Sequence, residues 1–393
     1  MSSPQAKHDY DLRLLTPFLL HALMFQVVTG LTRVTTSYRA IELDVSYIWY
    51  GAINSGYALL PIFLAISLGR YIDRGHDSHS IWIGSGFQLL ANLGFWLWPE
   101  TAWSLTLYSV IAGIGHLFTM AGHQALTLRC AGTVSREGVF GWYMVVLSVG
   151  QMIAPALISW LAGSAHIPPT GILFALAMAM SLATLAIAFT MRPALRPAGD
   201  VKDKPMVPLA EILGVPGLIA VIMASVMTVA SMDLAVIYLP LLGVERHIDA
   251  GNVGMVLMVR AVASIFSRVF YGPLLRIAGR AQLTFWSMAI ATFGYALIGL
   301  PLSVVWLYVA AVLIGFGLGL AVTVCLSNVV NLAPAGARGT AMTLRLTGNR
   351  MGQFLIPFAG SVIAGVAGVG GVFLVIALCL FGTGAAVKRV MIR

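Results

Sequence analysis

Twelve apolar runs, each long enough to cross a lipid bilayer, follow one another along the chain with short polar stretches between them. About 20 apolar residues span the hydrocarbon core as a helix, and a helix satisfies its own backbone hydrogen bonds, as lipid requires. The sequence therefore predicts an all-α membrane protein with twelve transmembrane helices, at 14–37, 46–68, 80–98, 103–128, 138–163, 169–191, 213–241, 251–271, 281–299, 303–330, 339–364 and 369–387.

The composition excludes the soluble classes of protein. Hydrophobic residues make up 59% of the chain and charged residues 9%, whereas soluble domains carry about 25% charged residues. Twelve spans use most of the 393 residues, so we expect no separate catalytic domain. The residues before the first span lack the features of a signal peptide, and we expect that span to be retained.

Sequence motifs of enzymes are also absent. The chain contains no GxxxxGK[ST] phosphate-binding loop, no HExxH and no GxSxG. Its three cysteines lack the spacing of a disulfide framework or of a metal site. We therefore predict no enzymatic activity, no cofactor and no bound metal.

The basic residues predict the orientation in the membrane. With both ends inside, 16 Lys and Arg residues fall on the inner side and two, Arg39 and Arg246, on the outer side, as the positive-inside rule favours. This distribution accounts for most of the formal charge of +9 without a nucleic-acid partner. We predict a multi-pass protein of the cell inner (plasma) membrane with both termini in the cytoplasm.

The two halves of the chain repeat each other. Residues of the fourth and fifth spans recur 202 positions later, where Gly113, Gly150, Gln151 and Pro155 return as Gly315, Gly352, Gln353 and Pro357. Such repeats are typical of transporters built from two related bundles. We predict an N-terminal six-helix bundle at 1–191, a cytoplasmic linker at 192–212 and a pseudo-symmetric C-terminal six-helix bundle at 213–393.

A motif between the second and third spans carries a family resemblance. The stretch GRYIDRGHD at 69–77 resembles the loop signature of the major facilitator superfamily, with Gly69, Asp73 and Arg74 at the matching positions. With its twelve spans, the whole chain is similar to bacterial secondary transporters of that family. The resemblance implies a monomer in which these three residues form a cytoplasmic gate. From the residues alone, the alternative is a basic loop whose acid balances its neighbours.

The fifth span carries a second, weaker resemblance. Its SVGQMIAP stretch at 148–155 is similar to the signature of the drug- and metabolite-proton antiporter branch, which favours export. Small residues let helices approach closely and proline bends a helix, so helix packing is the alternative explanation.

The spans contain five arginines but one carboxylate, Asp233. A charge inside the bilayer costs roughly 3 kcal/mol or more, so it marks a functional candidate. Arg260 and Arg350 each lie twelve residues from a predicted cytoplasmic helix end, about 18 Å deep at 1.5 Å per residue. Arginine keeps its proton, so we expect an anionic substrate to supply part of the compensating charge. Bonds to polar neighbours such as Asn349 and Gln353 are the alternative.

Arg33 and Asp233 occupy equivalent positions in the first and seventh spans, and their opposite charges predict an ion pair between the halves. Asp233 is also the candidate for proton coupling, because its protonation would release Arg33 and loosen an outer gate. A purely structural ion pair is the alternative. Arg33 is a candidate substrate contact as well. So is Arg345, which lies about 10 Å deep and could instead snorkel to the interface.

Uncharged polar residues and histidines complete the predicted substrate site. Gln26 and Gln151 lie in the first and fifth spans, and His116 and His123 share one face of the fourth span. We expect these residues to line a polar cavity together with Gln353 and Asn349. Histidines packed singly between helices are the alternative, and two histidines at this spacing do not chelate one metal from a single helix.

We therefore predict a proton-coupled secondary active transporter that moves an organic anion or zwitterionic metabolite, metal-chelating acids included, by alternating access. Its partners would be the small-molecule substrate, protons and the lipid bilayer. One alternative is a multidrug efflux antiporter for neutral or cationic compounds, for which an acid-rich cavity is expected. The other is a non-transporting membrane receptor.

Overall fold

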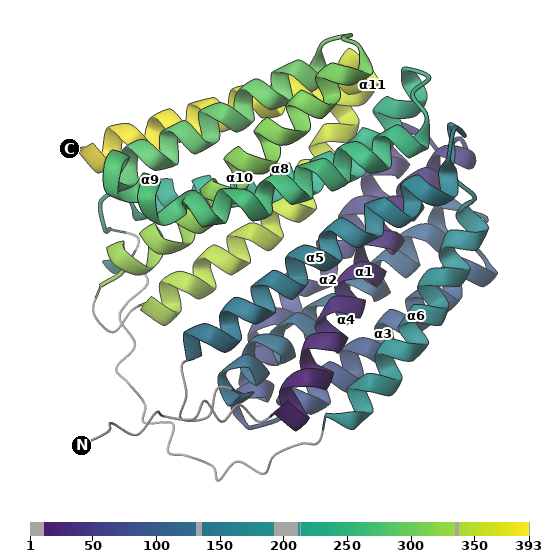
Figure 1. Ribbon diagram of the computed structural model, residues 1–393, viewed down its shortest axis with the longest axis horizontal. Helices are drawn as coiled ribbons and strands as arrows, with labels where there is room; N and C mark the ends of the chain where they lie inside the picture. The colour runs from purple at the N-terminus through teal and green to yellow at the C-terminus, as the bar shows by residue number, and fades with distance from the viewer. Residues whose placement is uncertain (1–11, 131–135, 192–210, 213, 335–337, 393) are drawn as a thin grey trace, which may run out of the picture.

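The computed structural model describes residues 12–130, 136–191, 211–212, 214–334 and 338–392, and within these ranges the protein is built of helices without strands (Figure 1). Most of the predicted linker, 192–210, lies outside the described residues. The long helices are α1 (Leu12–Glu42), α2 (Tyr47–Asp73), α3 (Asp77–Leu97), α4 (Ala102–Cys130), α5 (Arg136–Ala162), α6 (Thr170–Thr190), α8 (Leu218–Glu245), α9 (Ala250–Gly299), α10 (Val304–Leu332) and α11 (Arg338–Ile392).

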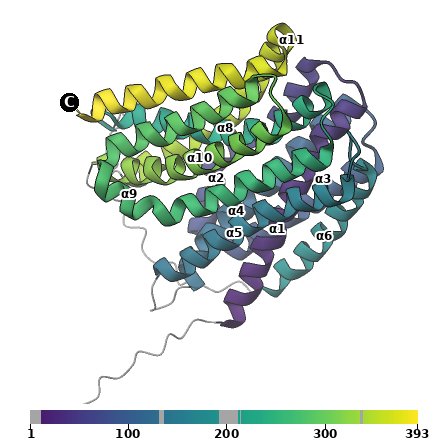
Figure 2. The same ribbon diagram turned by 45° about the horizontal axis from the view of Figure 1, so that its top comes forward.

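Nine of the described helices are long and apolar enough to cross a membrane, which is fewer than the twelve spans predicted. Two of the nine are double length, since α9 and α11 contain 50 and 55 residues. At 1.5 Å per residue they would measure about 75 and about 83 Å, against a bilayer core of about 30 Å. Each is interrupted by one glycine with positive φ, Gly279 (73°) and Gly368 (72°), a conformation that favours glycine. Figures 1 and 2 show the chain reversing direction within both helices.

Helix α3 is the long described helix that is not among the nine. Its polar residues lower its hydropathy, yet several of them are buried against other helices, including Ser80, Ser85, Gln88 and Asn92. Asn92, for example, donates a hydrogen bond to Ser181 Oγ of α6 at 2.7 Å. The hydropathy of α3 therefore understates how much of its surface is shielded by other helices.

The helices of the two chain halves form two groups that lie side by side (Figures 1 and 2). Residues at repeat-related positions make the same close approach in both groups. A Cβ atom at Gly113 would meet the backbone carbonyl of Tyr57, and one at Gly315 would meet the carbonyl of Arg260. Tyr57 and Arg260 are themselves related by the repeat, so the sequence repeat is also a repeat of helix packing.

The two groups make close contact at one end of the molecule, here called the closed end. Ser159 Oγ of α5 donates to the Gly251 carbonyl of α9 at 2.7 Å, and the Tyr50 hydroxyl of α2 donates to the Ile237 carbonyl of α8 at 2.5 Å. The largest apolar cluster includes residues of both halves. The closed end carries the helix connections at 43–46, 98–101, 163–169, 246–249 and 300–303.

Gly254 is expected to be essential for packing at the closed end. A Cβ atom there would lie 2.7 Å from the Pro155 carbonyl oxygen, and overpacking of this kind costs about 1–3 kcal/mol. We expect Gly254→Val to lower the midpoint of thermal unfolding of the purified protein. Gly272→Val is the matched control on the same helix, because no atom lies within 4 Å of a Cβ at Gly272. Equal midpoints for the two variants would contradict this account.

Candidate functional site

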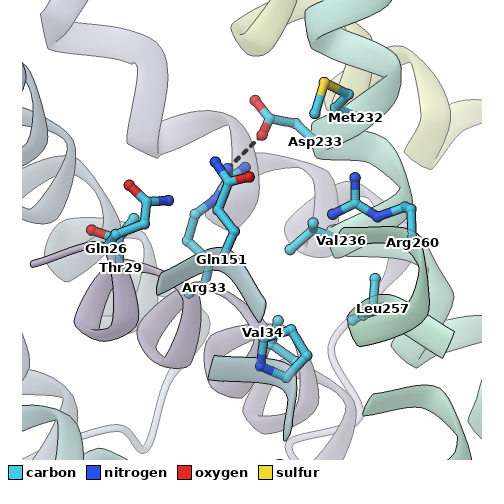
Figure 3. Close-up of a pocket in the computed structure, with 12 residues that line it drawn as sticks. Gln26, Thr29, Arg33, Val34, Gln151, Met232, Asp233, Val236, Leu257 and Arg260 are labelled. Carbon is cyan, nitrogen blue, oxygen red and sulfur yellow. Dashed lines mark hydrogen bonds and ion pairs between the residues drawn. The ribbon is translucent and has the colours of Figure 1, made fainter. Parts of the chain in front are cut away.

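A cavity of about 110 Å³ lies between the two halves, bounded by α1 and α5 on one side and by α8 and α9 on the other (Figure 3). Three charged side chains line it, Arg33, Asp233 and Arg260, and together they carry one net positive charge. The lining consists of Gln26, Thr29, Gly30, Arg33, Val34, Gln151, Pro155, Met232, Asp233, Val236, Leu257 and Arg260. We call this space the central cavity.

The structure brings Arg33 and Asp233 into contact across the two halves. Arg33 Nη1 lies 2.6 Å from Asp233 Oδ1, the pair drawn as a dashed line in Figure 3. The other carboxylate oxygen, Oδ2, accepts a hydrogen bond from Gln353 Nε2 at 2.6 Å. Gln353 Oε1 in turn accepts a hydrogen bond from Arg350 Nη1 at 3.0 Å. These four residues form a polar chain that joins α1, α8 and α11, and both oxygens of Asp233 are occupied within it.

Arg260 stands apart from this chain. Its Nε is buried without a hydrogen-bond partner, and among the described residues its side chain takes part in no ion pair within 4.0 Å. In Figure 3 its guanidinium group points into the central cavity. Arg260 is therefore a cation at the wall of a cavity between the two halves, with no ion pair to a described residue, and an isolated charge in such a place is costly.

The opposite wall presents two amide side chains, Gln26 of α1 and Gln151 of α5. Their approach depends on the neighbouring Gly150, because a Cβ atom there would lie 2.7 Å from Gln26 Cβ. An amide offers both donors and an acceptor. The central cavity thus opposes a cation with neutral groups that can bind either charged or uncharged atoms of a ligand.

Arg350 faces a second cavity. This space of about 390 Å³, which we call the inner cavity, lies between α2 and α4 of the first half and α11 of the second. Gly69 at the end of α2 also lines it, and the central and inner cavities share no lining residue. The two arginines predicted to lie deep in the membrane therefore face different spaces, Arg260 the central cavity and Arg350 the inner cavity.

Arg345 and Asn349 lie within the second half instead. Arg345 Nη1 donates to Ser225 Oγ at 3.1 Å, and Ser225 Oγ donates to Asn349 Oδ1 at 3.2 Å. Both side chains are buried, and neither is among the residues that line the two cavities. Their contacts join α8 to α11.

His116 and His123 are packed inside the first half and line neither cavity. His123 Nε2 lies 2.8 Å from Nδ1 of His21, a residue of α1. The His116 ring packs against the rings of Phe25 and Tyr57, with centroid distances of 5.8 and 5.3 Å. The structure thus separates these histidines from the glutamines and arginines with which the sequence analysis grouped them.

The gate residues predicted from the family resemblance lie where α2 ends. Gly69 lines the inner cavity together with Thr347 and Arg350 of α11, while Arg74 follows the last helical residue and is exposed. The side chain of Asp73 lies outside the described residues. In the described part of the chain no group of three or more His, Cys, Asp or Glu residues is placed to hold a metal ion.

Tyr57 is a part of the site that was not predicted from the sequence. The Arg33 guanidinium carbon lies 4.9 Å from the centre of the Tyr57 ring, a favourable cation–π distance. A signal was present, because the repeat relates Tyr57 to Arg260. Thr29, Met232, Val236 and Leu257 were also missed, since nothing in an apolar span marks which of its faces borders a cavity.

Comparisons with known proteins agree on the family and the fold. The Major Facilitator Superfamily profile matches residues 18–357, while a search of curated proteins finds no significant match. A variant of the nucleoside transporter NupG superposes with a TM-score of 0.83 at 12% identity, covering 96% of this chain and 99% of that one. A bacterial homologue of the human lysosomal transporter Spinster, inward-facing and occupied, gives 0.75 at 14%, covering 99% and 98%.

A third solved structure, a bacterial homologue of the iron transporter ferroportin in an inward-facing state, gives a TM-score of 0.71 at 18% identity. The match covers 97% of this chain and 98% of that one. At such identities these similarities establish the fold and leave the transported substrate open.

Proposed function

This chain belongs to the major facilitator superfamily, and from that premise we propose that it is a proton-coupled transporter of a small organic anion or zwitterion. The family and its solved relatives identify a multi-pass membrane transporter rather than an enzyme. The substrate class, the coupling to protons and the direction of transport are our proposals. We propose export, on the similarity of the 148–155 stretch to antiporters.

The main support for an anionic substrate is the position of the Arg260 guanidinium group. This group borders the central cavity without an ion pair to any residue that the structure describes, and both oxygens of Asp233 are occupied by Arg33 and Gln353. A guanidinium group keeps its charge and binds carboxylate or phosphate through two parallel hydrogen bonds. A substrate anion would therefore remove the largest electrostatic cost of this cavity. Gln26 and Gln151 would bind the polar atoms at its other end.

Asp233 supports the proposed coupling to protons. Among the residues that line the central and inner cavities it is the one carboxylate, and it joins the two halves through Arg33 and Gln353. Protonation would weaken its bond to Arg33 and so the link between the halves. Proton binding would in this way change the relative stability of the two conformations of an alternating-access cycle.

We propose that the structure is in an inward-facing state, which the contacts at the closed end support. The closed end carries the connections that the positive-inside rule places outside, and the inner cavity lies towards the predicted cytoplasmic ends of α2 and α11. Gly69 and Arg74, together with Asp73, would close this side when the inner cavity collapses. We further propose a monomer of the cell inner membrane with both termini inside.

We propose twelve spans, because two of the described helices are long enough to cross the membrane twice. We infer that α9 and α11 each cross the membrane twice, with reversals at Gly279 and Gly368, and that α3 crosses once despite its polar residues. Together with the other long helices this gives twelve spans, six in a bundle at 1–191 and six in a bundle at 213–393.

A binding screen tests the proposed substrate class. The purified protein would be titrated with lactate, succinate, citrate and dihydroxybenzoate, and the rise in its thermal unfolding midpoint would be measured, because a ligand of the folded state stabilises it. We call the acid with the largest effect the test anion. Uncharged nucleosides and cationic dyes form the comparison set. Stabilisation by these compounds and not by the acids would contradict the proposal.

Arg350→Gln is expected to lower transport of the test anion into proteoliposomes by about tenfold, because one hydrogen bond to a charged group is worth roughly 1.5–3 kcal/mol. The physical reason is the loss of the positive charge at the wall of the inner cavity. Arg389→Gln removes an exposed charge from the same helix and should have no effect. Unchanged transport in Arg350→Gln would remove Arg350 from the proposed path.

A further inference from the structure

The first half of the protein contains a row of polar groups that the proposed anion site does not use. His116, Thr119 and His123 are spaced i, i+3 and i+7 along α4 and therefore share one face of that helix. Each has a buried polar atom without a protein hydrogen-bond partner, namely His116 Nδ1, Thr119 Oγ1 and His123 Nδ1. Thr119 and His123 are fully buried. Three such atoms on one helical face are unusual, because buried polar groups are normally hydrogen bonded.

At the His123 end of this row, the side chains form a connected chain of hydrogen bonds. His21 Nδ1 lies 2.8 Å from His123 Nε2, and His21 Nε2 lies 2.9 Å from Ser85 Oγ of α3. An N–H of His123 directed at His21, with the other His21 nitrogen donating to Ser85, satisfies both contacts. It also leaves His123 Nδ1 as an acceptor without a donor, which costs less free energy than leaving a buried N–H without an acceptor. Besides His21, the titratable ring in contact with His123 among the described residues is that of Tyr143 of α5, with ring centroids 5.8 Å apart.

At the His116 end, ring contacts connect the row to the ion pair between the two halves. The His116 ring lies 5.3 Å from the Tyr57 ring, and the Tyr57 ring lies 4.9 Å from the Arg33 guanidinium carbon. Arg33 contacts Asp233 directly. The Tyr57 hydroxyl oxygen is a further buried polar atom without a protein partner. From His123 to Asp233, titratable rings and unpartnered polar atoms thus follow one another through the first half.

Internal water is the ordinary partner of such atoms, because buried water typically bonds to polar groups that protein atoms leave unsatisfied. Gln88 Oε1 of α3, also buried without a protein partner, adds an acceptor from the helix that packs on α4. A path of water and imidazole groups can pass protons, since histidine both accepts and donates a proton near neutral pH.

We propose that the α4 face of His116, Thr119 and His123, together with His21 and Tyr57, conducts protons between the inner part of the first half and Asp233. This inference rests on the proposed proton coupling and deepens it. The proton route lies in the first half and the anion-binding arginines of the cavities, Arg260 and Arg350, lie in the second. Neither histidine of α4 lines the central or the inner cavity, so protons and anions would follow separate routes that meet at Asp233.

The test compares two kinds of flux in proteoliposomes that contain a pH-sensitive dye. Exchange of labelled for unlabelled test anion at equal pH needs no net proton movement, whereas net uptake of the test anion moves protons that the dye records. In His116→Gln and His123→Gln we expect proton movement to fall by about tenfold or more, with exchange within about twofold of the wild type. His79→Gln is the matched control, because its Nδ1 is also buried without a partner but its ring packs on the rings of His76 and Trp82, which are not part of the proposed route.

Several outcomes would overturn the inference. One is unchanged proton movement in both histidine variants, and another is an equal loss of exchange and proton movement, which a structural role would produce. If His123→Gln does not fold, Thr119→Val removes the hydroxyl between the two histidines at nearly constant shape, and the same fall in proton movement is expected. A wild-type protein that exchanges the test anion but moves no protons would instead contradict the proposed coupling, and with it this route.

Discussion

Arg260→Gln is expected to abolish binding of the test anion while the protein still folds. The guanidinium group borders the central cavity and makes no ion pair within 4.0 Å with another described residue, so its removal breaks no contact that holds the halves together. It also lowers the net charge of the cavity lining from one positive charge to zero. Loss of two charge-assisted hydrogen bonds, at roughly 1.5–3 kcal/mol each, weakens binding by about a hundredfold or more.

Two further variants make the experiment on Arg260 specific. Arg260→Lys keeps the charge but lacks the planar fork that binds a carboxylate at two points, so binding should be weakened less than in Arg260→Gln. Arg276→Gln removes an exposed arginine from the same helix and should bind the test anion like the wild type. The measurement is the ligand-induced rise in unfolding midpoint, which also reports on folding in the absence of ligand. Wild-type binding by Arg260→Gln would disprove the proposed site.

The architecture was predictable because its physical causes are local and repetitive. Apolar runs of bilayer length specify helices, and the glycines that recur at 113 and 315 permit the same close approach in both halves. The pairing of Arg33 with Asp233 could also be anticipated, since the repeat places them at equivalent positions. The count of spans is less direct, because α3 buries polar residues against its neighbours and contains no stretch as long and apolar as those of the nine candidate spans.

The sequence did not predict that Arg260 and Arg350 face two separate cavities. Depth along a helix follows from residue spacing, and Arg260 and Arg350 have the same predicted depth. The face that each presents depends on how α9 and α11 rotate against their neighbours, which is set by packing over the whole interface. The histidines show the same limit. Their shared face on α4 was evident from their spacing. The contact of His123 with His21 was not, because these residues lie 102 positions apart in the chain and on different helices.

Asp233→Asn is expected to uncouple the transporter. Asparagine cannot release or accept a proton in the physiological range, so a pH gradient should no longer drive accumulation of the test anion. The amide oxygen can still accept a hydrogen bond from Arg33, which preserves part of the contact between the halves. Removal of the one carboxylate among the lining residues raises the net charge of the central cavity from one to two. Binding of the test anion should therefore become several-fold tighter even as accumulation is lost.

This pair of opposite changes separates coupling from damage to the fold. A misfolded or weakened protein would lose binding and accumulation together, because a buried ion pair that loses one charge costs about 3–5 kcal/mol when nothing replaces it. Asp249→Asn is the control, since Asp249 lies at the closed end, 3.7 Å from His166, and is more exposed than Asp233. It should keep accumulation driven by the pH gradient. If Asp233→Asn accumulated the test anion as the wild type does, the proton would have to act at another group, and the route through His116 would lose its end point.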